Sequence, residues 1–285
     1  MIKALRRAGV TLALTLGFAS FAFAQFGAEP AKLDLVKVRD DIYVIHNDVV
    51  PGNITVLVTD EGVLLVDTKY ALDYENVERM LRSVTDQPIV YVVNTHFHDD
   101  HSGANALFQG MDAHVIAHEK ARRKMVQSGR SEGLPNVTVD DHARIYIGDT
   151  VADLYYFGRA HTDGDIMVHF PQQRVLATGD MFAYGPETPE LVDYAGGGSA
   201  REWPYSLAKA LPLEFDTVVP GHGVVVGRAE LEEFYHDTMR LSELTHSMLQ
   251  QKKSRADIEA MLRREFSFAD FHIERSLDGL LVELE

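Results

Sequence analysis

The stretch Asn94-Thr95-His96-Phe97-His98-Asp99-Asp100-His101-Ser102-Gly103 indicates both the fold and the chemistry of this chain. It follows residues 88–93, a continuous apolar and β-branched run that is typical of a buried strand. Side chains alternate along an extended segment, so His96 and His98 face the same way and can bind one ion. Asp100 and His101 come after the strand pattern ends, where the chain can turn towards a second ion. Imidazole and carboxylate groups suit zinc or a similar first-row metal, so this stretch predicts a metal site rather than a polar turn.

Three later ligand-type residues also follow predicted strands. His161 comes after a strand that ends at residue 157, Asp180 after residues 174–177, and His222 after residues 217–219. Loops at strand ends build functional sites on a rigid scaffold, so we expect these residues near the histidine stretch. Asp67 follows the predicted strand 63–66, and we expect it to support the ligands rather than to bind metal itself.

The pattern His96-x-His98-x-Asp100-His101, followed by a second group of single residues, resembles the metallo-β-lactamase superfamily. The second group consists of His161, Asp180 and His222, and the resemblance runs from about residue 33 to residue 222. It implies an α/β fold, a four-layer αβ/βα sandwich of two mixed β-sheets with helices on both outer faces. It also implies that one metal is held by His96, His98 and His161 and a second by Asp100, His101 and His222, with Asp180 bridging them.

The hydrophobic pattern supports a layered α/β protein made of one domain, residues 25–285. Strands are expected at residues 33–38, 41–45, 53–58, 63–66, 88–93, 113–117, 137–139, 144–147, 151–157, 166–170, 174–177, 217–219 and 280–284. Helices are expected at residues 72–84, 104–108, 118–127, 201–211, 228–251 and 255–265. Residues 181–199 read as a long loop, and loops of that length are usually functional.

The first residues have the pattern of a secretory signal peptide. Lys3, Arg6 and Arg7 make a basic start, residues 8–21 are apolar, and Ala22-Phe23-Ala24 forms an A-x-A cleavage signal. The apolar run is shorter than the roughly 20 residues that a membrane span needs. We therefore expect residues 1–24 to be removed before Gln25, leaving a periplasmic or secreted protein with no stable membrane anchor.

Charge and composition narrow the choice of partners. The formal net charge of the 285-residue chain is −16, and removal of the three basic residues of the signal peptide would bring it to −19. So much negative charge argues against nucleic acid and leaves a small-molecule substrate as the expected partner. The chain has no Cys, so neither a disulfide nor a thiolate ligand is available. The sequence does not indicate the oligomeric state.

The resemblance implies hydrolysis with two zinc ions, with iron or manganese as alternatives. Two ions roughly 3.5–4 Å apart share a water and lower its pKa, so that hydroxide can attack a carbonyl carbon or a phosphorus. Asp100 is a candidate catalytic residue that orients the nucleophile or shuttles a proton. Tyr184 is a second candidate, because related lactonases carry a Tyr near this place that helps to hold the substrate carbonyl. A solvent-exposed position for Tyr184 is the alternative.

Several substrate classes remain open because this fold supports many reactions. Asp180 and Tyr184 favour a lactone or an ester. Export favours a β-lactam, but similar lactamases have Cys or Ser in place of Asp180, and one large group has Lys where this chain has Ala183. A phosphodiesterase, a glyoxalase II and a non-catalytic metal-binding or redox accessory protein are less favoured alternatives.

The remaining aromatic and imidazole side chains have simpler interpretations. Trp203 is expected in the core rather than in a substrate wall, because large aromatic side chains mostly serve burial. Eight histidines are expected to be surface or hydrogen-bonded residues: His46, His114, His118, His142, His169, His236, His246 and His272.

Overall fold

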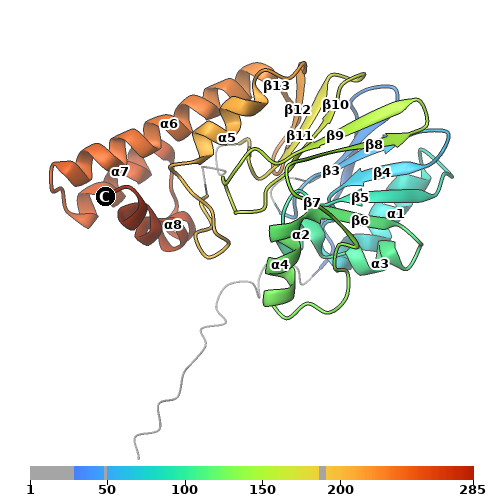
Figure 1. Ribbon diagram of the computed structural model, residues 1–285, viewed down its shortest axis with the longest axis horizontal. Coiled ribbons are helices and arrows are strands. Elements are labelled where there is room, and N and C mark those ends of the chain that lie inside the picture. The colour runs from blue at the N-terminus through green and yellow to red at the C-terminus, as the bar shows by residue number, and fades with distance from the viewer. Residues whose placement is uncertain (1–28, 48–49, 186–190) are drawn as a thin grey trace, which may run out of the picture.

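Two mixed β-sheets form the centre of the molecule (Figure 1). The computed structural model describes residues 29–47, 50–185 and 191–285. The first sheet has the strand order β1-β2-β3-β4-β5-β6-β7, with strands β1 (Asp34–Lys37), β2 (Ile42–His46), β3 (Ile54–Val58), β4 (Val63–Val66), β5 (Ile89–Val93), β6 (His114–His118) and β7 (Val137–Val139). The second has the order β13-β12-β11-β10-β9-β8, with strands β8 (His142–Ile147), β9 (Thr150–Tyr155), β10 (Met167–Phe170), β11 (Val175–Gly179), β12 (Thr217–Pro220) and β13 (Val226–Gly227).

The sheets pack face to face because their central strands are apolar on both sides. In β4, Leu64 and Val66 point between the sheets, where they join Phe170 of the second sheet in one buried cluster. Val63 and Leu65 point the other way, towards the outer helices. Burial of an aliphatic side chain of this size contributes ~1.5–3 kcal/mol. The uninterrupted apolar runs therefore reflect strands that are covered on both faces.

Helices cover both outer faces. The first half of the chain contains the short 3₁₀ helix η1 (Ala71–Asp73) and the helices α1 (Tyr74–Arg82), α2 (Asp99–Ser102), α3 (Asn105–Gln109) and α4 (Glu119–Gln127). The second half contains α5 (Trp203–Ala210), α6 (Arg228–Gln250), α7 (Arg255–Phe266) and α8 (Asp270–Glu283). Val77 and Leu81 of α1 lie one turn apart and pack with Phe108 of α3 against the first sheet. Helices α5–α8 enclose a separate core with the second sheet, and α6–α8 extend beyond the sheets (Figure 1).

This arrangement is the four-layer α/β sandwich that the sequence predicts, and most of its elements lie within a few residues of their predicted places. The predicted strand at residues 280–284 is wrong, because these residues belong to the end of α8 and the residues after it. Ile273, Leu277 and Leu280 recur at helical spacing and are buried, so the apolar residues continue a helical face. The sequence analysis also missed α2, a single helical turn within the histidine stretch, and the two-residue strand β13.

The carboxyl ends of five strands meet at one edge of the sandwich. Strands β4 and β5 are parallel in the first sheet, and β11 and β12 are parallel in the second. Strand β9 runs in the direction of β11 because β10 is antiparallel to both. Two backbone hydrogen bonds connect the sheets here, from Asn53 to Gly221 at 2.7 Å and from Ile166 to Thr95 at 2.9 Å. The loops that leave these strands are thereby held beside one another.

Some predictions concern residues outside the described part of the chain. The signal peptide at residues 1–24 and its cleavage before Gln25 lie there, as do residues 186–190 of the predicted long loop. In the described ranges, no helix combines the length and the apolar character that crossing a membrane requires.

Candidate metal centre

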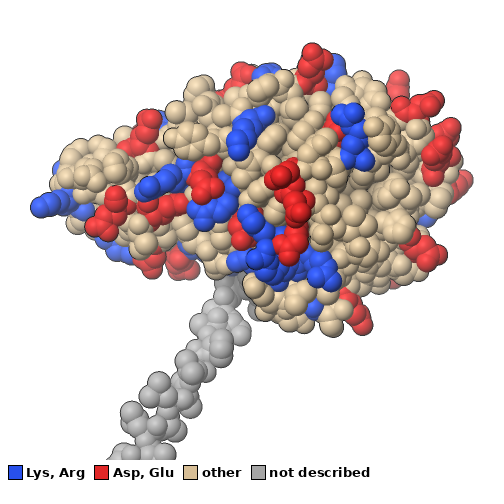
Figure 2. All heavy atoms as spheres, viewed as in Figure 1, with Lys and Arg blue, Asp and Glu red and all other residues tan. Residues whose placement is uncertain are grey.

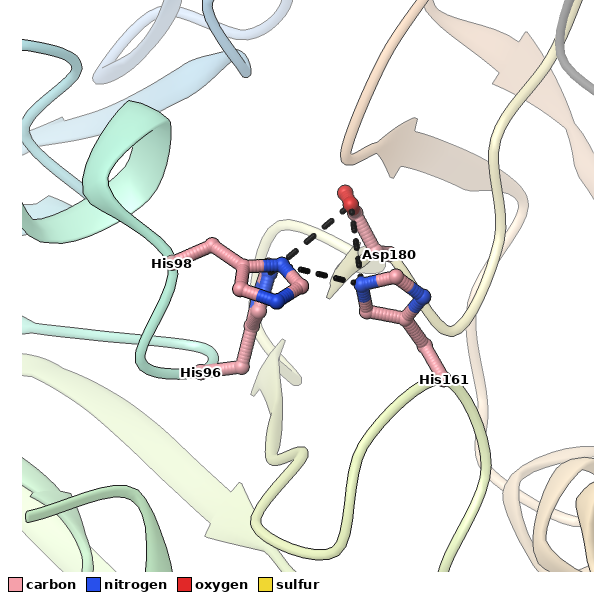
Figure 3. A group of neighbouring side chains, drawn as sticks. All are labelled: His96, His98, His161 and Asp180. Atoms are coloured by element: carbon pink, nitrogen blue, oxygen red, sulfur yellow. Dashed lines mark hydrogen bonds and ion pairs between the residues drawn. The ribbon is translucent and has the colours of Figure 1, made fainter. Parts of the chain in front are cut away.

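The seven side chains predicted as ligands meet at the edge where the strands end. They form two groups, and within each group the candidate ligand atoms lie within 4.8 Å of one another. The first group consists of His96, His98, His161 and Asp180 (Figure 3), and the second of Asp100, His101 and His222. The loops after β5, β9, β11 and β12 and the helical turn α2 bring them together.

Three imidazoles converge in the first group. Nδ1 of His98 lies 3.0 Å from Nε2 of His96 and 3.1 Å from Nε2 of His161. Oδ2 of Asp180 lies 3.7 Å from Nε2 of His96 and 3.6 Å from Nε2 of His161. Donor atoms bound tetrahedrally to one zinc ion at its usual bond lengths lie about 3.3–3.6 Å apart. The four separations lie within a few tenths of an ångström of this range, so the side chains in Figure 3 are close enough together to surround a single ion.

Asp180 faces the second group through its other oxygen. Its Oδ1 lies 3.1 Å from Nε2 of His101 and 3.4 Å from Nε2 of His222. Oδ2 of Asp100 lies 3.4 Å from Nε2 of His222 and 3.6 Å from Nε2 of His101. Asp180 Oδ1 is buried and has no partner in hydrogen-bond geometry, an arrangement that is costly without a compensating charge. The residues present thus fit two metal ions with Asp180 between them.

Asp67 orients one histidine of each group, His101 directly and His96 through Thr95. Its carboxylate accepts hydrogen bonds from the backbone N–H and the hydroxyl of Thr95, each at 2.8 Å, and lies 2.8 Å from Nδ1 of His101. The Thr95 hydroxyl in turn lies 3.1 Å from Nδ1 of His96. Partners of this kind fix the orientation of a ligating imidazole and leave Nε2 free for the metal. Asp67 has a left-handed φ of 69°, a backbone strain that is characteristic of functional sites.

A different segment orients the other two histidines of the first group. Nε2 of His98 lies 2.9 Å from Oδ2 of Asp193, and Nδ1 of His161 lies 2.6 Å from the carbonyl oxygen of Leu191. Burial would raise the pKa of Asp193, but its hydrogen bond to His98, the charge of that imidazole and the backbone N–H of Gly196 together outweigh burial and hold the pKa below the usual range. The sequence analysis did not single out Asp193. Its only signal was its place in the long loop at residues 181–199.

Three of these side chains, Asp180, His101 and His96, have strongly shifted pKa values because they are buried close to one another. Burial would raise the pKa of Asp180, but the surrounding imidazoles, His101 foremost, hold it well below the usual range. Burial opposes a charge on His101, yet Asp180, Asp100 and Asp67 together raise its pKa well above the usual value. The pKa of His96 is lowered by its burial and by the neighbouring imidazoles. The imidazoles around Asp180 thus favour the ionised form of its carboxylate.

The comparison with known families agrees with this geometry. A sequence model described as the metallo-beta-lactamase superfamily matches residues 47–222, which is more than half of the chain and includes all seven side chains. The chain belongs to the metallo-beta-lactamase superfamily. It is therefore a metal-dependent hydrolase of this superfamily, as the sequence predicts.

Individual relatives are distant in sequence. The chain is 31% identical over 196 residues to the metallo-beta-lactamase type 2 of Bacillus sp. (strain 170), a match that covers 67% of this chain and 74% of the relative. It is 23% identical over 220 residues to the metallo-beta-lactamase type 2 of Elizabethkingia meningoseptica, covering 74% and 86%. The solved structure of a metallo-beta-lactamase from Pontibacter korlensis superimposes with a TM-score of 0.63 at 23% identity, covering 72% of this chain and 99% of that one.

In this member of the superfamily, the loop before β3 packs directly on the second group. A Cβ atom at Gly52 would lie 2.1 Å from the ring of His101, so only glycine fits there. The Gly52 N–H donates to the carbonyl of Asp100 at 3.2 Å, and the Asn53 side chain donates to the carbonyls of Pro220 and Gly223, on either side of His222. The sequence analysis missed these contacts because no local pattern distinguishes a glycine beside a histidine ring.

A buried lysine, which the sequence analysis also missed, donates hydrogen bonds to the loop that contains Gly52. Lys69 is fully buried, and its Nζ donates to the carbonyl of Gly52 at 2.6 Å and to Oδ1 of Asn47. Burial lowers the pKa of Lys69 to about 7, although the carboxylates of Asp73 and Asp100 act in the opposite direction. A buried lysine is rare in a protein core, so its position cannot be read from composition alone.

The two aromatic candidates differ in their surroundings. Trp203 is 2% exposed and donates from Nε1 to the carbonyl of Met181 at 3.0 Å, which confirms core packing. Tyr184 is 38% exposed, and its backbone N–H donates to the carbonyl of His222 at 2.9 Å. Tyr184 is therefore tied to a ligand loop and partly open to solvent, while its role in binding substrate stays a prediction.

The other histidines lie outside the two groups, as expected. His114 and His236 are exposed, and His272, in the first turn of α8, accepts a hydrogen bond from the backbone N–H of Ala269. The remaining five hydrogen-bond elsewhere: His46 with Asn53, His118 with Asp140 and Lys120, His142 with Asp153, His169 with Glu214, and His246 with Leu284.

Proposed function

We propose that this protein is a dinuclear zinc hydrolase whose preferred substrates are lactones or esters. The observation that carries the proposal is Asp180, which presents one carboxylate oxygen to each group of ligands. Two bound ions would supply a Lewis acid for the substrate oxygen and a water of lowered pKa as the nucleophile. Iron and manganese are the alternatives to zinc for this set of nitrogen and oxygen ligands.

The residues of the chain have separate roles in this proposal. Asp100 is 17% exposed at its side chain and can both bind the second ion and accept or deliver a proton at the reacting centre. Tyr184 borders the loop of His222 and can place its hydroxyl on the substrate carbonyl. His96, His161 and His101 are buried and held by fixed partners, so they need no rearrangement during the reaction.

The preference for lactones and esters follows from the charge at residue 180. A carboxylate between the two ions adds negative charge and makes them weaker electrophiles than a neutral Ser would. An amide nitrogen, as in a β-lactam, needs strong stabilisation as it leaves, whereas an alkoxide leaves more readily. Ala183 also offers no cation for the carboxylate of a β-lactam. Hydrolysis of β-lactams is the second candidate, favoured by the similarity to proteins named metallo-beta-lactamases.

The test measures both substrate classes at equal metal loading. We expect kcat/KM for lactones or esters to exceed that for β-lactams by at least about 10-fold, equivalent to about 1.4 kcal/mol of transition-state discrimination. His96→Ala should abolish both activities, while Asp180→Ser or Asp180→Cys should shift the ratio towards β-lactams. Faster turnover of β-lactams than of every lactone and ester tested would establish the second candidate instead.

Metal content provides an independent test. We expect two ions per chain, and Asp180→Ala should weaken mainly the second ion because it removes the carboxylate that lies between the groups. Metal analysis after dialysis against a graded series of zinc concentrations measures both ions. A single tightly bound ion at saturation, unaffected by Asp180→Ala, would contradict the dinuclear proposal.

Export is part of the same proposal. The basic start, the short apolar run and Ala22-Phe23-Ala24 predict a mature domain of residues 25–285 that acts in the periplasm or outside the cell. N-terminal sequencing of the protein recovered from its native host should begin at Gln25. A chain that begins at Met1 in that sample would exclude cleavage.

A further inference from the structure

The last helix, α8, packs along the segment that orients the first group of ligands. This segment comprises residues 191–201 and is called the support segment below. The Ser276 hydroxyl of α8 donates to the carbonyl of Val192 at 3.3 Å. One turn further, a Cβ atom at Gly279 would lie 2.0 Å from the ring of Tyr194, so the ring lies directly on the helix backbone. Helix α8 therefore contacts the support segment immediately before and immediately after Asp193.

Glu283 makes the third and most extensive contact between α8 and the support segment. Its carboxylate accepts hydrogen bonds from the hydroxyls of Tyr194, at 2.9 Å, and Ser199, and from the backbone N–H of Arg201 at 3.3 Å. It also lies 3.5 Å from Nη2 of Arg159, which precedes His161 by two residues. The Glu283 side chain is only 17% exposed, so these contacts are partly shielded from water. Charge-assisted hydrogen bonds of this kind are stronger than neutral ones.

The support segment reaches two of the three histidines of the first group. Asp193 holds Nε2 of His98, and the Leu191 carbonyl accepts from His161. The backbone of the segment is also bound to the loop of His161, from Asp193 N–H to the His161 carbonyl at 2.9 Å and from Ser199 N–H to the Ala160 carbonyl at 2.9 Å. A shift of the segment would therefore change the direction in which Nδ1 of His98 and Nε2 of His161 point.

The second group has different supports. Asp67 orients His101, and Gly52 packs on its ring, and both come from loops of the first sheet. We infer that α8, acting through Glu283 and the support segment, is a positioning element for the first metal site and not for the second. The inference rests on the proposed metal centre, and Glu283 is a positioning residue because it acts through Asp193 and His161.

The experiment measures zinc affinity in two single-site backgrounds. His222→Ala leaves the first group intact, and His96→Ala leaves the second group intact. Glu283→Gln is introduced into each background and into the wild-type chain, and affinity is measured by competition with a chromophoric chelator. Replacing a direct outer partner of a ligand costs about 10–100-fold in metal affinity, and Glu283 lies one contact further away. We therefore expect an increase in Kd of at least about threefold in the His222→Ala background and less than about 1.5-fold in the His96→Ala background.

Two variants and one control separate positioning from general damage to α8. Tyr194→Phe removes only the hydroxyl that donates to Glu283, and it should weaken the same site selectively. This variant provides the test if Glu283→Gln does not fold. Asp278→Ala is the matched control, because Asp278 lies on the same helix but pairs with the exposed Arg255 of α7. Asp278→Ala should leave zinc affinity unchanged in both backgrounds. In an Asp193→Asn chain, the further effect of Glu283→Gln should be smaller than in the wild-type chain, because the connection to His98 is already broken and only the connection to His161 remains.

The outcomes distinguish the inference from the proposed function. Equal weakening of both sites by Glu283→Gln, or no weakening of the first site, would overturn the inference while two ions bound to the wild-type chain would still support the proposed function. A wild-type chain that binds no zinc would overturn both. The alternative is that Glu283 has a purely structural role. In that case Glu283→Gln would lower the melting temperature of the metal-free protein, measured by circular dichroism, and would not affect one metal site more than the other.

Discussion

Replacing Lys69 with methionine should change how the stability of this protein depends on pH. The Lys69 side chain is fully buried, and burial lowers its pKa from 10.5 to about 7. Below about pH 7 the lysine is protonated in both the folded and the unfolded chain, so folding carries the full cost of burying a charge. Between pH 7 and 10.5 the unfolded chain binds the extra proton, so the free energy of unfolding rises with pH.

The size of this effect follows from the two pKa values. Each pKa unit corresponds to about 1.4 kcal/mol, so the full difference between 10.5 and about 7 is about 5 kcal/mol. Between pH 7 and 9.5, the wild-type chain should gain about 3 kcal/mol relative to Lys69→Met. Methionine also leaves the Gly52 carbonyl and Asn47 Oδ1 without their donor, at about 1–3 kcal/mol each, but that cost does not depend on pH.

The assay is urea denaturation of the metal-free proteins at several pH values from 7 to 9.5. Metal is removed because its binding is itself pH-dependent and would shift the apparent stability. Subtracting the variant from the wild type cancels the contributions of other titrating groups. Lys32→Met, at an exposed lysine, is the control and should give a constant difference. A constant difference for Lys69→Met as well would refute the reasoning, because it would mean that Lys69 keeps an ordinary pKa in the folded protein.

Two further predictions concern residues on opposite sides of the metal centre. Asp67→Asn should weaken zinc binding at the second group by about 10–100-fold, because it replaces the carboxylate that orients His101. Chelator competition in the His96→Ala background measures this loss, and an unchanged affinity would show that Asp67 is not needed. Trp203→Ala should lower the free energy of unfolding by about 3–5 kcal/mol, because it leaves a large cavity in the core around α5. Urea denaturation measures this change. If the variant still binds two ions at urea concentrations where it remains folded, Trp203 contributes to core packing and not to metal binding.

Sequence patterns predict the parts of this molecule that are encoded locally. The strand before His96 is recognisable because a run that is apolar at every position needs cover on both faces. The candidate ligands His161, Asp180 and His222 are recognisable because each follows a predicted strand, and carboxyl ends of parallel strands meet at one edge. The residue types and their positions directly after strands therefore point to the same candidate site.

Contacts between distant segments are not encoded in this way. Asp193 is separated from His98 by 95 residues and lies in a loop without periodicity, so nothing local pairs them. Lys69 could be placed in the core only once the loop around Gly52 was known to offer it two acceptors. Helix α8 was misread because its last apolar residues, taken alone, fit a strand as well as a helix. For Asp193 and Lys69 the missing information was the neighbour in space, whereas for α8 the helical spacing of Ile273, Leu277 and Leu280 was present in the sequence.

The two groups of candidate ligands depend largely on different parts of the fold, and Asp180 is in contact with both. The first group is oriented largely by the support segment and α8, whereas the second is oriented by Asp67 and the loop around Gly52. A displacement on either side changes the distance from a histidine to one oxygen of Asp180, and the carboxylate can follow that histidine. Because a carboxylate is rigid, a shift of one oxygen also moves the other. The geometry at residue 180 therefore links the two proposed metal sites, whose other shared support is Asp67, so the choice of Asp rather than Cys or Ser should affect metal binding and substrate preference together.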